Sequence, residues 1–171
     1  LTKYDWSGKV LSGTITNDGK AVFKTTLKST TVDSEIYAGL FKEITGKISG
    51  IKLEVSFNLD FRTETSKTIF VGGFAGKNSA SGEIIGCGFV CDKMNINVGK
   101  NSLYFGGVVA QNVGTITNEI TKNSLLTTLV SGEFIISCEQ TALLVVGGAV
   151  GLNNGTIKRT IEKGLVEFNN S

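Results

Sequence analysis

Proline and histidine are both absent from this chain of 171 residues, and methionine and tryptophan occur once each. Without histidine the chain cannot build a Ser-His-Asp or Cys-His catalytic arrangement, or an imidazole metal site. The absence of proline suits stacked strands, because proline cannot donate to the hydrogen-bond ladder of a sheet. We therefore expect no metal, no cofactor and no catalytic residue, and we expect that the protein is not an enzyme.

An excess of charge and a long apolar run are also lacking. The 17 Lys and Arg residues nearly balance the 15 Asp and Glu residues, for a net charge of +2. No basic cluster provides the electrostatic footprint of a nucleic-acid-binding protein. No window approaches the roughly 18 apolar residues of a membrane-spanning helix. We expect neither a nucleic-acid partner nor a transmembrane segment.

Cysteine is scarce, and Cys87, Cys91 and Cys138 fit no common zinc-binding spacing. Cys87 and Cys91 lie four residues apart in an expected strand, about 13 Å from each other, which is too far to form a bridge. Cys138 follows Gly132-Glu133 much as Cys87 follows Gly82-Glu83, so these two cysteines are candidates for a disulfide between neighbouring coils. Buried, unbridged thiols are the favoured interpretation.

Glycine, by contrast, is abundant at 22 residues, and much of it belongs to a phrase that occurs three times. The phrase is two glycines, a few small or apolar residues, an asparagine, and then a glycine with an isoleucine two positions on. It occupies residues 72–84, 106–116 and 147–157. The Gly-x-Ile ending recurs at Gly13, Gly46, Gly82, Gly114 and Gly155, in steps of 33, 36, 32 and 41 residues. Self-similarity at such a period indicates a repeat architecture.

Between these glycines the pattern is typical of strands. Residues 51–62 alternate between apolar odd positions and mostly polar even positions, as a half-buried strand does. No segment has a convincing period of 3.6 residues, so we expect little helix. A repeat of about three short strands cannot bury its own apolar face and needs neighbours stacked on it. The sequence predicts an all-β fold, a parallel β-solenoid of four to five coils with roughly three strands per coil.

The phrase has a structural explanation in such a fold. Its asparagines would form a ladder at one corner, where each amide bonds the next coil and the local turn. Its later glycines would take the positive φ that a corner needs. These asparagines are Asn78, Asn112 and Asn153, and these glycines are Gly82, Gly114 and Gly155. The apolar members expected in the core are Phe74, Val108, Ala149, Ile84, Ile116 and Ile157.

We expect residues 1–171 to form a single solenoid segment. Residues 1–45 would be a divergent first coil or an end cap, because their copy of the phrase is degraded and terminal repeats are often atypical. Residues 46–171 would be the regular repeats. The chain starts at Leu1 and ends just after a repeat has restarted, so we expect a fragment of a longer chain.

The phrase resembles the GLUG-type repeat, which is named for its Gly-Leu-hydrophobic-Gly core. The similarity lies in Gly73-Phe74-Ala75-Gly76 with Asn78, and in Gly148-Ala149-Val150-Gly151 with Asn153. The copy between them departs from the pattern, with Ala110 in place of the second glycine. The resemblance implies a secreted or surface repeat protein of the adhesin kind, with a parallel β-helix shape and no catalytic residue to transfer.

The function we expect is that of a non-catalytic structural or adhesive segment of a secreted or cell-surface repeat protein. Its location would be extracellular or at the cell surface. Its partners would be the rest of a longer polypeptide, or other chains that pair with the solenoid ends, since sheet edges attract further strands. Glycans or a host surface are candidate ligands.

Two alternatives remain open, a carbohydrate-active β-helix enzyme and a β-sandwich carbohydrate-binding module. The enzyme would need clustered carboxylates in a groove; Asp60, Arg62 and Glu64 could form a polar cluster on one strand face, although an exposed, paired strand surface is favoured. Parallel ladders between copies would favour the solenoid, and antiparallel hairpins the sandwich. Trp6 is expected to cap the first coil. Asn169 begins a glycosylation sequon, which has meaning only in a eukaryotic secretory setting.

Overall fold

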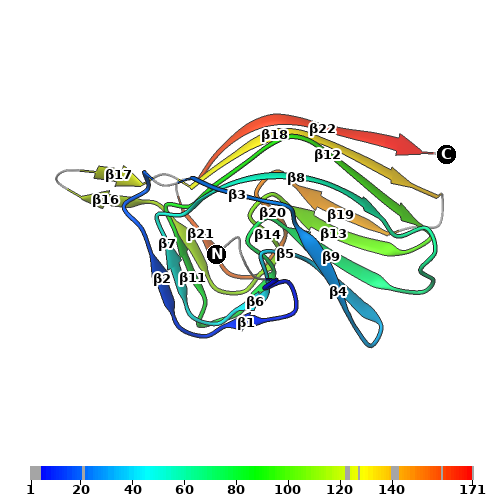
Figure 1. Ribbon diagram of the computed structural model, residues 1–171, viewed down its shortest axis with the longest axis horizontal. Helices are drawn as coiled ribbons and strands as arrows, with labels where there is room; N and C mark the ends of the chain where they lie inside the picture. The colour runs from blue at the N-terminus through cyan, green and yellow to red at the C-terminus, as the bar shows by residue number, and fades with distance from the viewer. Residues whose placement is uncertain are drawn as a thin grey trace.

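The computed structural model describes residues 5–20, 22–121, 124–126, 128–139, 143–158 and 160–170. Every regular element in these ranges is a strand, and none is a helix (Figure 1). Nearly all of the strand pairs are parallel, and the two exceptions are described below. The predicted all-β class with parallel sheets is confirmed.

Four sheets of five strands each contain most of the described strands, and we call them sheets A to D. Sheet A consists, in spatial order, of β1 (Val10–Leu11), β6 (Phe41–Ile44), β10 (Ala75–Asn78), β14 (Val109–Asn112) and β20 (Val150–Asn153). Sheet B consists of β2 (Thr14–Thr16), β7 (Lys47–Ser49), β11 (Glu83–Ile85), β15 (Thr115–Thr117) and β21 (Thr156–Ile157). Both sheets are parallel throughout.

Four of the five strands of sheet C, all but β3, are longer than the strands of the other sheets. Sheet C consists of β3 (Val22–Thr25), β8 (Lys52–Asp60), β12 (Gly88–Gly99), β18 (Thr128–Cys138) and β22 (Thr160–Asn170). Sheet D consists of β4 (Lys28–Val32), β5 (Glu35–Gly39), β9 (Thr68–Gly72), β13 (Ser102–Gly106) and β19 (Leu144–Gly147). In sheet D the edge strand β4 runs antiparallel to β5, and the other pairs are parallel.

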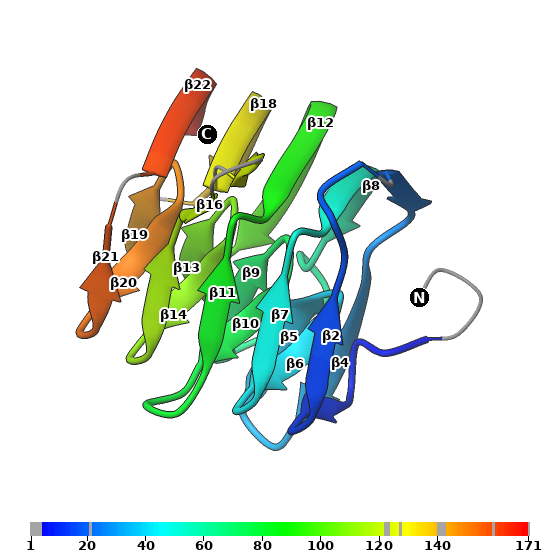
Figure 2. The same cartoon turned by 90° about the vertical axis from the view of Figure 1, so that its left-hand side faces the viewer.

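From β5 onward the chain passes through the sheets in the constant order D, A, B, C. It does so four times, and we number these passages repeats 1 to 4: β5–β8, β9–β12, β13–β18 and β19–β22. Figure 2 shows β2, β7, β11 and β21 of sheet B in sequence order along the molecule, and β15 lies between β11 and β21. The expectation of about three strands per repeat was too low, because the short strands of sheets A and B are separate elements joined by a tight corner.

One insertion interrupts this order. The antiparallel hairpin of β16 (Glu119–Thr121) and β17 (Ser124–Leu126) lies between β15 and β18 and belongs to none of the four sheets. It projects from the side of the molecule in Figure 1. The hairpin explains why the step from Gly114 to Gly155 is the longest of the glycine spacings.

The paired glycines of the phrase mark the corner between sheets D and A. A Cβ on Gly72 would lie 2.1 Å from the carbonyl oxygen of Ala75, and one on Gly73 would lie 2.0 Å from the Phe89 ring. Real Cβ atoms do not approach other atoms so closely, so the corner has room only for glycine. The Gly73 N–H donates to the Gly107 carbonyl of the next repeat at 3.1 Å, which keeps the repeats in register through the corner.

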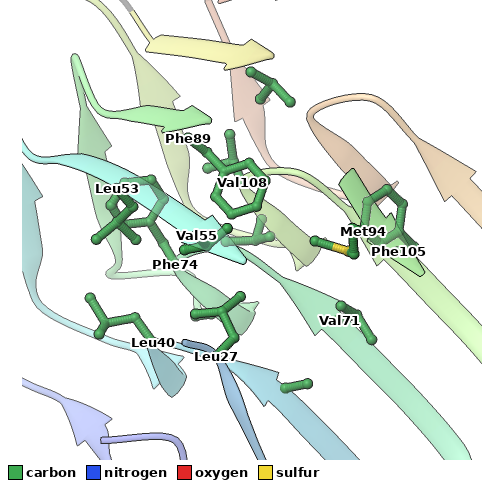
Figure 3. Close-up of a cluster of buried hydrophobic side chains, with 14 of the residues drawn as sticks. Leu27, Leu40, Leu53, Val55, Val71, Phe74, Phe89, Met94, Phe105 and Val108 are labelled. Atoms are coloured by element: carbon green, nitrogen blue, oxygen red, sulfur yellow. The ribbon is translucent and has the colours of Figure 1, made fainter. Parts of the chain in front are cut away.

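A continuous apolar core runs between the sheets (Figure 3). Phe74, Val108 and Ala149 are buried in it at equivalent positions of three repeats, and Ile84 and Ile116 are buried under sheet B. Burying one such large side chain contributes about 1.5–3 kcal/mol. The core therefore supplies the force that holds the repeats together, and the hydrogen bonds fix their register.

Candidate functional site

The asparagines of the phrase lie one above another at the corner between sheets A and B. Asn78 pairs with Asn112 and Asn112 with Asn153 in the strand register. The Asn78 Nδ2 group donates to Asn112 Oδ1 at 2.8 Å, and Asn112 Nδ2 donates to Asn153 Oδ1 at 2.8 Å. Each amide also donates to the carbonyl of the corner glycine in its own repeat, at 3.2–3.3 Å. The arrangement is a structural amide ladder, with Asn78 and Asn112 fully buried.

This ladder begins at Asn78, because the preceding repeat has Ile44 at the paired position. The side-chain oxygen Asn78 Oδ1 is buried and has no hydrogen-bond partner among the described residues. An unsatisfied buried acceptor costs about 1–3 kcal/mol. The first amide is therefore held by its two donated bonds alone, which makes it depend strongly on Asn112.

The corner glycines Gly82, Gly114 and Gly155 serve close packing. A Cβ on Gly82 would lie 2.1 Å from Asn78 Oδ1, and a Cβ on Gly114 or Gly155 would lie 2.3 Å from the corner carbonyl of the preceding repeat. The expectation of positive φ at these residues was wrong, because positive φ occurs one corner later, at Gly50 and Gly86. There the chain leaves sheet B for sheet C.

The three cysteines are unbridged. The register pairs Cys138 with Gly99, at the far end of β12 from Cys87, so the candidate Cys87–Cys138 disulfide does not fit this arrangement. Burial raises the pKa of Cys87 to about 12 and, with a smaller contribution from the nearby Asp92 charge, that of Cys91 to about 11. Neither thiol has the lowered pKa that a nucleophile needs.

An aromatic stack on the outer side of sheet D was not anticipated from the sequence. The rings of Tyr37, Phe70 and Tyr104 lie 5.3 and 5.1 Å apart and nearly parallel. Lys77 lies over the Phe70 ring at 4.8 Å. A Cβ on Gly76 would come within 2.6 Å of the Tyr37 ring, so this glycine of the phrase makes room for the stack. Each ring lies two residues before a glycine at the corner between sheets D and A, and this spacing was visible in the sequence. These glycines are Gly39, Gly72 and Gly106.

The first ring of the stack has polar partners as well. The Tyr37 hydroxyl donates to the Glu35 carboxylate, which also lies 3.5 Å from Lys77 Nζ. Burial, followed by the hydrogen bond to Glu35, raises the pKa of Tyr37 well above its ordinary value. With Tyr37 and Phe70 almost fully buried, the stack serves as packing between sheets D and A more than as an open platform for a ligand.

A groove of about 730 Å³ lies at the N-terminal end of the molecule. Buried Leu27, Leu40 and Val55 contribute apolar surface to it, and Trp6 lines it from the N-terminal segment. Trp6 also packs at a tilt against Phe41, with 6.0 Å between the ring centroids.

Two ion pairs lie among the charged side chains around this groove. Lys24 Nζ lies 2.8 Å from a carboxylate oxygen of Glu54, and Lys28 Nζ lies 3.5 Å from Asp5. Hydrogen bonds from Ser7 hold the pKa of Asp5 below its usual range. A general acid needs a raised pKa, so Asp5 is poorly suited to that role.

The remaining candidate residues are not brought together into a site. Asp60 forms a bidentate pair with Arg62 on the exposed surface, and these hydrogen bonds lower the pKa of Asp60. Glu64 contributes instead a backbone carbonyl, which accepts from Asn101 Nδ2 at 2.9 Å. Asn169 belongs to β22, and its side chain is outside the described part of the chain. No group of three His, Cys, Asp or Glu side chains that could hold a metal occurs among the described residues.

Asn101 is a structural residue that the sequence reasoning missed. This buried amide donates to the carbonyls of Phe61 and Val98 as well as Glu64, and its Oδ1 accepts from the Lys67 N–H at 2.9 Å. It thereby holds the loop between β8 and β9 from the following repeat. Its single occurrence gave no repeated signal in the sequence.

No protein-family model matches this chain, and neither a curated protein nor a solved structure matches it significantly. The described residues include no helix that is long and apolar enough to cross a membrane.

Proposed function

We propose that this chain is a non-catalytic structural or adhesive segment of a secreted or cell-surface repeat protein, in which the four sheets form a β-solenoid. The observation that carries the proposal is the parallel pairing of repeats 1 to 4 in all four sheets, reinforced by the amide ladder. A stack in which each repeat is hydrogen-bonded to its neighbours forms a stiff body that resists local unfolding. The resemblance to GLUG-type repeats supports an extracellular or surface location.

The outer faces suit such a role. Sheet C presents exposed Lys52, Glu54, Ser56 and Asn58 on β8, and the exposed Asn95 amide donates to Asn58 Oδ1 at 2.9 Å. Polar side chains repeated on a rigid face can bind a polar partner at several points at once, so that weak contacts add up. Glycans and host-surface glycoproteins are the ligand classes that fit this chemistry.

The parallel pairing weighs against a β-sandwich binding module, which would be built from antiparallel hairpins. A carbohydrate-active enzyme is the stronger alternative. The best location for its active site is the N-terminal groove, where the carboxylates of Asp5 and Glu54 already form ion pairs with lysines.

The test is to incubate the purified protein with immobilised glycans, extracellular-matrix glycoproteins and soluble polysaccharides, and to measure both retention and product release. Retention without product supports an adhesive segment. Where nothing is retained or released, a high unfolding force in single-molecule stretching supports the structural role. Release of shortened polysaccharide at a rate proportional to protein concentration would overturn the proposal in favour of the enzyme.

A further inference from the structure

The edge strand of sheet C, β3, is shorter than its neighbour β8. Strand β3 pairs with β8 only from Lys52 to Val55, whereas β8 continues to Asp60. After Thr25 the chain crosses towards β4, which joins sheet D instead. Within the ranges that the structure describes, no strand pairs with Ser56–Asp60 on this side.

The direction of the backbone groups at this edge follows from two hydrogen bonds on the other side of β8. The Phe61 N–H donates to the Asn97 carbonyl at 2.7 Å, and the Gly88 N–H donates to the Ile51 carbonyl at 2.8 Å. Successive residues of a parallel strand direct their N–H and C=O groups to opposite neighbours. The backbone N–H and C=O groups of the odd residues of β8 therefore face β12. Those of Ser56, Asn58 and Asp60 face the open edge.

The surroundings of this edge suit the addition of a further strand. The N-terminal groove begins beside it, at Glu54–Ser56, with Leu27 and Leu40 among its lining residues. Figure 3 shows the side chains of Leu27, Leu40 and Val55 gathered beneath β8. An added strand could continue the line of β3 and bury its inward side chains against this apolar surface.

The side chains of β8 also define what such a strand must carry. Inward residues such as Leu59 alternate with exposed ones such as Asn58. On the opposite side Asn95 already donates to Asn58 Oδ1, so the Asn58 amide group can donate to an acceptor on the open side, as the corner amides do. The matching pattern is apolar, Asn or Asp, apolar. Strand β12, which pairs with the opposite side of β8, has this pattern at Met94–Ile96. These three residues are in register with residues 57–59.

We propose that the open edge of β8 is a docking site for an extended segment of a partner polypeptide, which adds in parallel to Ser56–Asp60 and carries an Asn or Asp between two apolar residues. Main-chain hydrogen bonds supply the affinity in such strand addition, and alternate side chains supply the specificity. Edge strands invite this pairing when nothing covers them. The partner segment occupies the position that a longer β3 would have filled.

The probe is a labelled peptide with the sequence of residues 93–98, Lys-Met-Asn-Ile-Asn-Val, titrated with the folded protein in fluorescence anisotropy. Binding should saturate at one peptide per protein. Ser56→Pro removes one N–H from the open edge and none from the ladder with β12, so affinity should fall about tenfold, equivalent to about 1.4 kcal/mol. Ser56→Ala is the matched control and should bind as the unaltered protein does.

Hydrogen exchange on the unaltered protein tests the same contact without a variant. The peptide should slow exchange of the Ser56, Asn58 and Asp60 amides and leave that of Leu59, which faces β12, unchanged. A peptide with proline in place of its isoleucine should protect none of them. Failure of the peptide to bind, equal binding by Ser56→Pro and Ser56→Ala, or uniform protection along β8 would overturn the proposal. A Ser56→Pro-sensitive dimer of the protein alone in light scattering would also overturn it, since the occupant would then be a second copy.

Discussion

At the scale of single residues, the corner asparagines differ in what lies on either side of them. Asn112 accepts a hydrogen bond from Asn78 and donates one to Asn153. Asn153 stands at the end of the ladder and is exposed. The same residue type therefore has unequal importance at equivalent positions.

Asn112→Ala should lower the free energy of unfolding by about 2–3 kcal/mol, because it leaves the buried Asn78 amide with one partner fewer and removes two ladder bonds. Asn153→Ala is the matched control and should cost about 1 kcal/mol or less. Equilibrium urea unfolding measures both values. Equal losses for the two variants would contradict the ladder as a source of stability.

Gly82→Ala should also be destabilising, by about 1–3 kcal/mol, because its Cβ would overlap Asn78 Oδ1 at 2.1 Å. Gly13 begins the same Gly-x-Ile sequence in the N-terminal part, yet a Cβ there meets nothing within 4 Å. Gly13→Ala should therefore leave stability nearly unchanged. Thermal melting of the two variants distinguishes close packing from a general intolerance of alanine at this motif.

The three thiols should differ in reactivity because they differ in burial. Because the pKa of Cys87 is raised to about 12 and that of Cys91 to about 11, both stay protonated at pH 8. Only Cys138, which is partly exposed, should react with a thiol reagent in the native protein at that pH. In strong denaturant three thiols should react. A count of two or three fast thiols in the native state would show that the core opens more easily than its packing indicates.

At the scale of elements, the side-chain amide of Asn101 makes three hydrogen bonds to the loop between β8 and β9. Asn101→Ala removes the hydrogen bonds to Phe61, Glu64, Val98 and Lys67. We expect this loop to become the first site of cleavage in limited proteolysis. Asn95→Ala removes only an exposed amide pair and should leave the cleavage pattern unchanged. Identical digestion of the two variants would show that the loop is held by other contacts.

The sequence predicted some features of these elements and missed others. The Gly-x-Ile steps and the alternation of residues 51–62 predicted parallel strands stacked by repeat. The number of sheets was underestimated, because strands of three or four residues carry too few alternations to be counted separately. The glycine backbone angles were misassigned, because a short-range motif does not distinguish a corner that needs positive φ from one that needs space. Asn101 escaped notice, because three of its four hydrogen-bond partners lie 34–40 residues before it in the sequence.

At the scale of the whole molecule, the two ends of the core are covered differently. Leu103, Phe105 and Val109 of repeat 3 are fully buried, whereas their register partners Leu144, Val146 and Val150 in repeat 4 are only half-buried. At the other end Trp6 and Leu27 pack over the first layers. Stability in a stacked array depends on nearest neighbours, so it should decline toward repeat 4.

Hydrogen exchange followed by mass spectrometry should show this gradient. Amides of β20 should exchange at least about tenfold faster than those of β10, which corresponds to about 1.4 kcal/mol of opening free energy. The strands share a sheet and a length, so each serves as a control for the other. Uniform protection would indicate that the array unfolds as one cooperative unit.

The β16–β17 hairpin shows where the chain tolerates a change in length. On one side of it Thr115 still pairs with Thr156, and on the other Thr128 pairs with Thr160, so the register is the same before and after the insertion. The amide corner varies less: Asn78 and Gly82 are four residues apart where Asn112 and Gly114 are two apart, and the strands on both sides of the corner stay in register. The strand register is thus kept while the corners change in length, and of these two corners the one between sheets B and C carries the larger insertion.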